Sequence, residues 1–226
     1  MTIETTCDYL QNHPLFANIS KEKILEAASL VRVRTVYRGE TISFGDGAFS
    51  KIFLLISGKI KVAEFGQRET ELIKDIITAP DIFGNLSMDG HPSKDEYAEA
   101  LTANVLICVF TVSDFKNILQ ENPSMLISFA GIVTAKLTRL EHRHSDLVFC
   151  DTKSRLIHFI KNWAQTDGSK VGGKIVLSNY LTHTDIANSI SASRQTVNVL
   201  FNELRDAGML LYNRKQIELS LAFNWN

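Results

Sequence analysis

Short apolar runs rich in β-branched and aromatic residues occupy much of the first half of the chain. They lie between about residues 30 and 112, and glycines such as Gly58 and Gly84 separate them. Glycine marks turns that need positive φ or close backbone approach, and runs of this length are typical of strands. The pattern predicts a β-barrel or β-sandwich. Ser20 is expected to cap a short helix just before it.

The apolar positions change to a helical period after Pro123. They then step by three or four residues, which predicts one helix of about 25 residues with an apolar seam. The seam consists of Leu126, Phe129, Val133, Leu137, Leu140, His144 and Leu147. When such a helix projects from a barrel, little of its own chain is available to cover this seam. A second copy related by a twofold axis is therefore the preferred partner. The alternative is a long helix packed on its own barrel.

A third pattern follows Cys150, and we expect a new domain to begin at Asp151. The segment KSRLIHFIKNWAQ places apolar residues on one helical face, TDGSKVGG is typical of a surface turn, and KIVL predicts a short strand. Two helices then follow in quick succession. Thr182 and Asp185 fit a capping box at the start of the first, and Ser193 is expected to cap the second.

The second of these helices is two-sided, with an apolar face at helical spacing and guanidinium and amide groups opposite. Such groups match the donor and acceptor pattern of base edges in the major groove, and the helix N-terminus suits a phosphate. The following LLYNRKQIEL predicts a β-wing. The predicted DNA contacts are Ser193, Arg194, Gln195, Thr196, Asn198, Asn202, Arg214 and Lys215. The alternative is a small helical bundle with a polar outer face.

Charge and composition agree with this interpretation. Residues 151–226 contain 9 Lys and Arg against 6 Asp and Glu, a surplus of three positive charges in a chain whose net charge is -1. A basic segment suits a polyanion, although a surplus this small is weak support on its own. No apolar run approaches the roughly 20 residues of a membrane span, and no signal peptide is visible, so we expect a cytoplasmic protein without a membrane partner.

The sequence contains no motif that predicts catalysis. It has no G-x-x-x-x-G-K-[ST] loop, no H-E-x-x-H and no G-x-S-x-G. We therefore do not expect an enzyme. A second hypothesis is a ligand-sensing regulatory module that acts through protein contacts, with a degenerate winged helix as its docking surface. Arg194, Gln195 and Asn198 together favour DNA binding.

Over nearly its whole length the sequence resembles the CRP/FNR family of transcription regulators. The matching segments are GETISFGDG, IFLLISGKIKV and DIFGNL, the long helix from Pro123, and HTDIANSISASRQTVNVLFNELRDAGML. The resemblance implies an α+β protein. Its parts are a jelly-roll-like double-stranded β-helix in residues 1–122, a dimerisation helix in 123–150 and a winged helix-turn-helix in 151–226. It also implies a homodimer on palindromic double-stranded DNA, control by a ligand in the barrel, and RNA polymerase as a partner.

The ligand site departs from the cyclic-nucleotide binders of this family. Asn85, Lys94 and Asp95 stand where those relatives have Glu, Arg and Ser, and the hydroxyl-bearing pair of the long helix corresponds to Leu140 and Glu141. Lysine lacks the planar fork of arginine, and a carboxylate beside a phosphate is repulsive. The effector pocket is predicted at Gly84, Asn85, Leu86, Lys94, Asp95, Leu140 and Glu141, and cyclic AMP is not expected there.

Other cofactors of the family find little support. An iron–sulfur cluster needs several thiolates, whereas Cys7 stands alone at the N-terminus, and the three cysteines are widely spaced. Haem needs an axial donor, for which His13, His91 and His144 are nominal candidates only. At the seam, paired His144 rings could sense pH or a metal, but a structural polar residue is the preferred interpretation. No metal site is predicted, and the effector remains unidentified.

Overall fold

The computed structural model describes residues 2–45, 50–66, 70–88 and 95–220 of the chain. It forms two compact units, Met1–Arg139 and Leu140–Asn226. The division falls inside the long helix α4 (Pro123–Phe149), whereas the sequence predicts boundaries after residues 122 and 150. Those boundaries stay a prediction. Among the described residues, no helix combines the length and apolar character that crossing a membrane requires.

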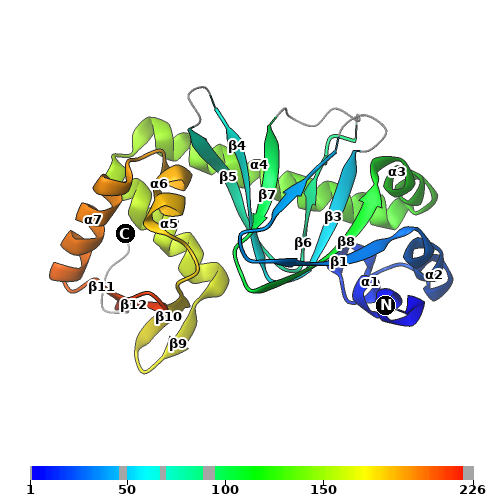
Figure 1. Ribbon diagram of the computed structural model, residues 1–226, viewed down its shortest axis with the longest axis horizontal. Helices are drawn as coiled ribbons and strands as arrows, with labels where there is room; N and C mark the ends of the chain where they lie inside the picture. Colours follow the sequence, from blue (N-terminus) through cyan, green and yellow to red (C-terminus); the bar gives the residue numbers. More distant parts are fainter. Residues whose placement is uncertain (1, 46–49, 67–69, 89–94, 221–226) are drawn as a thin grey trace. The chain divides into compact units, whose positions relative to one another are not determined.

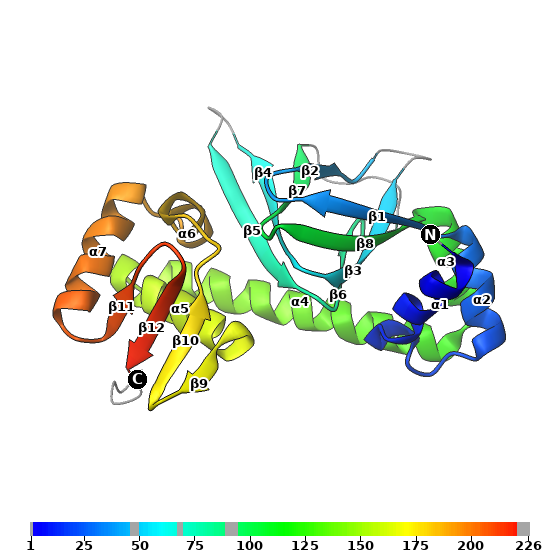
Figure 2. The ribbon, with the colours of Figure 1, turned by 60° about the horizontal axis from the view of Figure 1, so that its bottom comes forward.

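Eight strands of the first unit form two antiparallel sheets that face each other, which confirms the predicted barrel (Figures 1 and 2). The sheet orders are β1-β8-β3-β6 and β2-β7-β4-β5. Rings of Phe44, Phe53 and Phe83 pack in the core between the sheets, with Phe53 and Phe83 stacked at 4.8 Å. The strands are β1 Arg32–Tyr37, β2 Thr41–Ser43, β3 Lys51–Ser57, β4 Lys59–Phe65, β5 Glu71–Thr78, β6 Asp81–Gly84, β7 Glu96–Ala100 and β8 Asn104–Thr111.

Helices cover the outer face of the β1-β8-β3-β6 sheet and form a second core with it. Ser20 caps α2 as predicted, since its hydroxyl accepts a hydrogen bond from the Lys23 amide. The other helices before α4 were not predicted from the sequence. The helical elements of this unit, besides the start of α4, are α1 Ile3–Gln11, the 3₁₀ turn η1 Pro14–Phe16, α2 Lys21–Leu30 and α3 Val112–Glu121.

The structure corrects one member of the predicted apolar seam on α4. Phe129 is only 8% exposed, and its ring lies 5.8 Å from that of Phe115 in the second core. Phe129 therefore packs within its own chain, against the ring of Phe115 on α3. Ala130, one residue later, is exposed and fits the helical spacing of the predicted seam.

The rest of the seam remains accessible along α4. Leu126, Leu137, Leu140 and Leu147 are each about half exposed, at 48%, 54%, 58% and 48%. His144 is exposed and Val133 is half-buried against the second core. With Ala130 in place of Phe129, the steps from Leu126 to Leu147 alternate strictly between four and three residues, which is the heptad spacing of a coiled coil.

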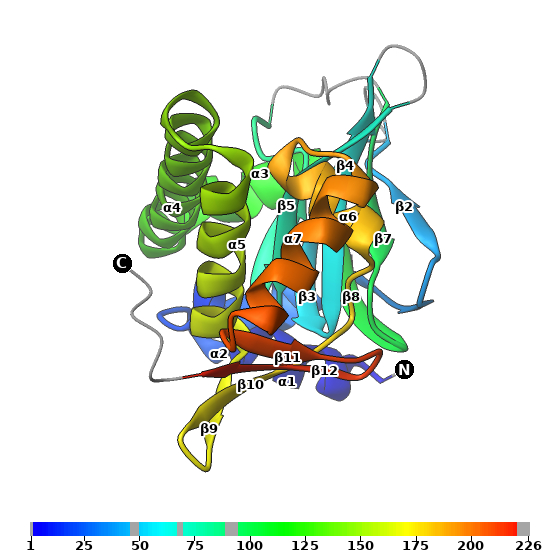
Figure 3. The same ribbon diagram turned by 90° about the vertical axis from the view of Figure 1, so that its left-hand side faces the viewer.

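The second unit contains two helices and a four-stranded antiparallel sheet after the α5 helix (Figure 3). The sheet order is β11-β12-β10-β9, and the hairpin of β11 and β12 is the predicted wing. TDGSKVGG differs from the predicted surface turn, because part of it forms β9 and Gly172 and Gly173 turn the chain with positive φ. The elements are α5 Thr152–Asp167, β9 Ser169–Val171, β10 Lys174–Ser178, α6 His183–Ile190, α7 Arg194–Asp206, β11 Leu210–Tyr212 and β12 Gln216–Ser220.

Candidate nucleic-acid interface

Local capping signals fix the corner between α6 and α7, which lie together in Figure 3. Thr182 accepts a hydrogen bond from the Asp185 amide, and the Asp185 carboxylate accepts one from the Thr182 amide at 2.9 Å. This confirms the predicted capping box. Ser191 ends α6 in the left-handed region at φ 53°, and Ser193 caps α7 by accepting from the Thr196 amide at 3.0 Å.

Arginine side chains hold the C-terminal end of α6 in place. Arg155 of α5 donates to the carbonyl oxygens of Ile190 at 3.0 Å and of Ser191 at 3.4 Å, and Arg143 of α4 donates to that of Ser189 at 3.0 Å. The last carbonyls of a helix lack partners within the helix and carry partial negative charge, so guanidinium groups stabilise them. These two arginines therefore stabilise the corner between α6 and α7.

The apolar face of α7 is fully engaged in the core of the second unit. Val197, Phe201 and Leu204 are fully buried and Leu200 is 9% exposed. Burying four such side chains accounts for roughly 1.5 to 3 kcal/mol each relative to leaving them in water. This face fixes the rotation of α7 about its own axis, and the opposite side must then point outward.

The outward side carries most of the predicted DNA contacts. Arg194, Gln195 and Asn198 are exposed. The hydroxyls of Ser193 and Thr196 lie 2.8 Å apart at the N-terminus of the helix, with Thr196 half-buried. This arrangement presents guanidinium and amide donors beside the positive end of a helix dipole, which suits an anionic duplex.

Asn202 is engaged differently from the other predicted contacts. It is half-buried, and its Oδ1 accepts a hydrogen bond from the Tyr212 hydroxyl of β11 at 3.3 Å. It lies two turns after Arg194, at the end of the strip nearest the wing. Its side chain joins α7 to the wing.

His183, at the start of α6, is a residue that the sequence analysis missed. Its ring lies 4.8 Å from the ring of Phe201 and 5.7 Å from that of Tyr212. Burial, and then the positive charge of Arg194, lower the pKa of His183, while the Asn198 side chain has the opposite effect. The imidazole therefore lies beside the exposed Asn198. No spacing in the sequence links these two residues.

The tip of the wing is a tight turn built on Asn213. Its Oδ1 accepts hydrogen bonds from the amides of Lys215 at 2.7 Å and of Gln216 at 3.0 Å, while Asn179 donates to its carbonyl oxygen at 2.7 Å. An asparagine that bonds to the backbone two and three residues ahead stabilises such turns. The turn leaves the predicted phosphate contacts Arg214 and Lys215 exposed.

Four residues of the predicted effector pocket are described in the first unit, namely Gly84, Asn85, Leu86 and Asp95. Asn85 is buried, and its amide donates to the Ser50 hydroxyl at 2.8 Å while its Oδ1 accepts from Ser87 at 2.7 Å. Gly84 has φ +100°, and a Cβ there would lie 2.6 Å from the Lys51 carbonyl oxygen.

The remaining members of that pocket do not all belong to the described part of the first unit, so the pocket stays a prediction. Leu86 packs against the second core, and Asp95 has a positive φ of 65°. Lys94 lies outside the described residues, and Leu140 and Glu141 belong to the second unit.

Charged side chains occupy one end of the barrel's inner face. Lys74 of β5 contacts Glu64 of β4 at 2.6 Å and Glu96 of β7 at 3.2 Å. Glu64 and Glu96 are paired across the sheet and alternate with the core residues Val62 and Ala98, so they continue the same face. Two carboxylates around one ammonium give these three side chains together a net negative charge.

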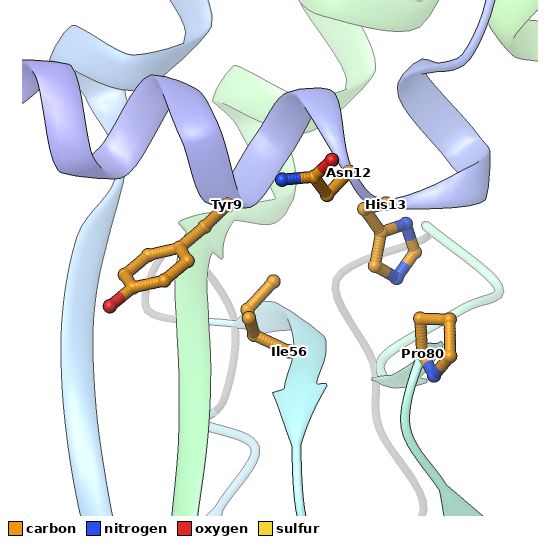
Figure 4. Close-up of a pocket in the computed structure, with 5 residues that line it drawn as sticks. All are labelled: Tyr9, Asn12, His13, Ile56 and Pro80. Carbon is orange, nitrogen blue, oxygen red and sulfur yellow. The ribbon is translucent and has the colours of Figure 1, made fainter.

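A small cavity of about 220 Å³ lies between the N-terminal helices and the barrel (Figure 4). One of its lining residues, His13, was a nominal haem ligand. Both of its ring nitrogens are already bonded: Nδ1 accepts from the Leu15 amide at 3.3 Å, and Nε2 lies 3.1 Å from the Asp81 carbonyl oxygen. Burial lowers the pKa of His13. The cavity is lined by Tyr9, Asn12, His13, Ile56 and Pro80.

The other nominal haem donors are His144 and His91. His144 is exposed on α4, and His91 lies outside the described residues.

Known families match separate parts of the chain. Residues 154–220 match the Crp-like helix-turn-helix domain, and residues 33–122 match the cyclic nucleotide-binding domain. Together these segments cover more than half of the chain, in the order that the resemblance implies. The chain belongs to the CRP/FNR family.

Individual CRP/FNR proteins align over most of the chain. The CRP-like cAMP-activated global transcriptional regulator of Mycobacterium tuberculosis is 24% identical over 81% of this chain and 81% of its own length. The global nitrogen regulator of Nostoc sp. is 24% identical over 82% of this chain and 83% of its own. The solved structure of a CooA mutant from Carboxydothermus hydrogenoformans has 25% identity and a TM-score of 0.70 over 85% of each chain.

As a CRP/FNR protein, the chain is a DNA-binding transcription regulator with a ligand-sensing domain, and not an enzyme. The α6–α7 corner and the wing fall within the helix-turn-helix match, and the barrel falls within the cyclic nucleotide-binding match. These assignments confirm the predicted fold class.

Proposed function

We propose that this regulator recognises its operator through the exposed strip of α7, with Arg194, Gln195 and Asn198 on base edges and Ser193 and Thr196 on a phosphate. The observation that carries the proposal is the orientation of α7. Its buried face fixes the helix so that these donors point outward from a capped N-terminus. Arginine suits guanine O6 and N7, and the amides suit adenine N6 and N7.

The test begins with selection of preferred duplexes from a randomised pool by the full-length protein. Affinity for the selected duplex is then compared between the native chain and Arg194→Ala. Loss of one bidentate base contact is expected to weaken binding by about 1 to 3 kcal/mol, roughly 5- to 150-fold, and to relax base preference at one position of each half-site.

Arg205→Ala is the matched control, because this exposed arginine lies at the other end of α7 and is paired with Asp206 at 2.9 Å. It is expected to leave base preference unchanged. Equal affinity and identical selected sequences for Arg194→Ala and the native chain would refute this strip as the base-reading surface. Failure of the native chain to enrich any duplex would favour the protein-docking alternative.

We further propose that two copies associate along the exposed seam of α4 and bind a palindromic operator. The supporting observation is the heptad spacing of the half-exposed leucines along α4. Two recognition helices in successive major grooves lie about 34 Å apart, so the half-sites should be separated by one helical turn of DNA. RNA polymerase is the proposed protein partner of the bound dimer.

For the sensor domain, we propose a signal other than cyclic AMP. Asn85 already uses its amide on Ser50 and Ser87, and Glu64 and Glu96 place negative charge on the inner face of the barrel. A cyclic phosphate near such carboxylates meets repulsion of about 4 kcal/mol per charge pair at 4 Å with an effective dielectric near 20. Calorimetric titration with cyclic AMP is expected to show no saturable binding, although the Mycobacterium relative is named as cAMP-activated.

A further inference from the structure

Three side chains of metal-ligating type meet where α4 passes into α5. Asp146 and Cys150 are four residues apart and so share one face at the end of α4, and His158 lies two turns into α5. Nδ1 of His158 is 2.9 Å from Oδ1 of Asp146, and the Cys150 thiol donates to the same oxygen at 3.7 Å. The three potential ligand atoms all lie within 4.8 Å of one another.

The two distances to the Asp146 oxygen are close to those of a tetrahedral metal site. With Zn–S near 2.3 Å and Zn–N and Zn–O near 2.0 to 2.1 Å, ligand atoms around tetrahedral zinc are about 3.3 to 3.6 Å apart. The sulfur-to-oxygen distance of 3.7 Å already fits, and the nitrogen-to-oxygen distance of 2.9 Å must widen by a few tenths of an ångström. Small side-chain rotations can supply that change.

We propose that Asp146, Cys150 and His158 form a binding site for a divalent cation of the zinc class, which would clip the end of α4 to α5. A thiolate, an imidazole and a carboxylate match a borderline-soft ion, whereas calcium and magnesium prefer oxygen ligands alone. The thiolate and the carboxylate together balance two positive charges. On binding, the thiol proton leaves to solvent and the imidazole proton moves to Nε2.

The site is partly open to solvent, and the adjacent turn supplies no fourth protein ligand. The His158 and Asp146 side chains are 45% and 29% exposed, so water can complete the coordination. Asp151, next in the chain, is committed to capping α5, because its Oδ1 accepts from the Ser154 amide at 2.7 Å. Three protein ligands and one open position are a known zinc arrangement.

The experiment uses the full-length protein after metal removal, with Co²⁺ as the spectroscopic probe and Zn²⁺ as its competitor. The native chain is expected to bind one Co²⁺ per chain, with a near-ultraviolet sulfur-to-cobalt charge-transfer band that Zn²⁺ abolishes. Cys150→Ser should remove this band. His158→Asn should weaken Co²⁺ affinity at least tenfold, since removing even groups that only orient ligands costs about 10- to 100-fold.

Cys7→Ser is the matched control, because Cys7 is a partly exposed thiol on α1 in the other unit and should leave the band unchanged. A band that persists in Cys150→Ser, a band lost in Cys7→Ser, or the absence of saturable Co²⁺ binding by the native chain would overturn the site. Circular dichroism monitors folding. If Cys150→Ser does not fold, the affinity of His158→Asn decides instead.

Any effect of the bound cation on operator affinity rests on the proposed function, and it is measured in a separate DNA-binding experiment. Zn²⁺ is expected to change the affinity of the native chain for its selected duplex at least threefold, and to leave that of His158→Asn unchanged. Loss of DNA recognition with Co²⁺ binding intact would count against the proposed function alone. Equal DNA affinity with and without Zn²⁺ would overturn the coupling and leave the site standing.

Discussion

The hydroxyl of Tyr212 in β11 lies 3.3 Å from Oδ1 of Asn202 in α7 and donates a hydrogen bond to it. The ring of Tyr212 also contacts the ring of Phe201 at 5.1 Å. Through these two contacts the wing is fixed to the last turns of the helix. Asn202 therefore joins the helix to the wing, whereas Asn198, one turn earlier, is exposed on the outward strip.

Asn198→Ala and Asn202→Ala are expected to have different effects for this reason. Asn198→Ala should weaken binding to the selected duplex by about 1 to 3 kcal/mol and relax one base position. Asn202→Ala should lower the free energy of unfolding by about 0.5 to 1.5 kcal/mol through the lost hydrogen bond and leave base preference unchanged. Fluorescence anisotropy and urea unfolding measure the two quantities. A relaxed base position in Asn202→Ala would place that amide on the DNA.

The features that the sequence predicted are those set by local chemistry. Ser20, Thr182 and Ser193 cap helices because a hydroxyl three residues before a free amide can act with no help from the rest of the fold. The two faces of α7 follow equally from spacing alone. Glycines between apolar runs likewise predicted the turns of the barrel.

The features that the sequence missed depend on which surfaces meet in space. Phe129 and Ala130 both fit steps of three or four residues, and only the position of Phe115 decides which of them the chain buries. The group formed by Asp146, Cys150 and His158 spans two helices, and the angle between the helices is not encoded in residue spacing. Likewise, His183 and Asn198, whose side chains influence each other, lie on different helices.

Leu137→Glu is expected to dissociate the proposed dimer. Leu137 is 54% exposed at the centre of the seam, where a pair of carboxylates would face each other across the twofold axis at a cost in desolvation and repulsion. Analytical ultracentrifugation should show the native chain as a dimer and this variant as a monomer. Ala135→Glu, an exposed position on the opposite side of α4, should remain dimeric. Equal masses for the two variants would exclude the seam as the interface.

His13 is expected to make the first unit less stable as the pH falls. Its folded-state pKa lies below the usual 6.5, so the unfolded chain takes up a proton that the folded chain resists. The contribution of neutral His13 to the free energy of unfolding is fully present above a pH of about 6.5. Below that pH it is lost by up to about 1.4 kcal/mol per pH unit, until the folded-state pKa is reached. Protonation would remove the acceptor that His13 offers to the Leu15 amide.

His13→Asn keeps a capping acceptor at this position and cannot titrate. Urea unfolding between pH 7.5 and about pH 5 should therefore show a shallower loss of stability for this variant than for the native chain. His183 contributes a loss of the same sign in both proteins, because its pKa is also lowered, so the difference in slope isolates His13. Identical slopes would mean that His13 takes up its proton equally in the folded and unfolded states.

Arg214 and Lys215 at the wing tip are expected to contribute salt-dependent affinity without base preference. Each phosphate contact releases about 0.9 counterions, so Lys215→Ala should reduce the slope of log affinity against log salt by about 1, and Arg214→Ala should do the same. Binding to the selected duplex is measured between about 50 and 200 mM salt. Lys21→Ala, an exposed lysine of α2 in the other unit, serves as the control and should leave the slope unchanged. If the wing variants keep the native slope, the turn built on Asn213 is a structural element of the sheet and the contacts to phosphate come from α7 alone.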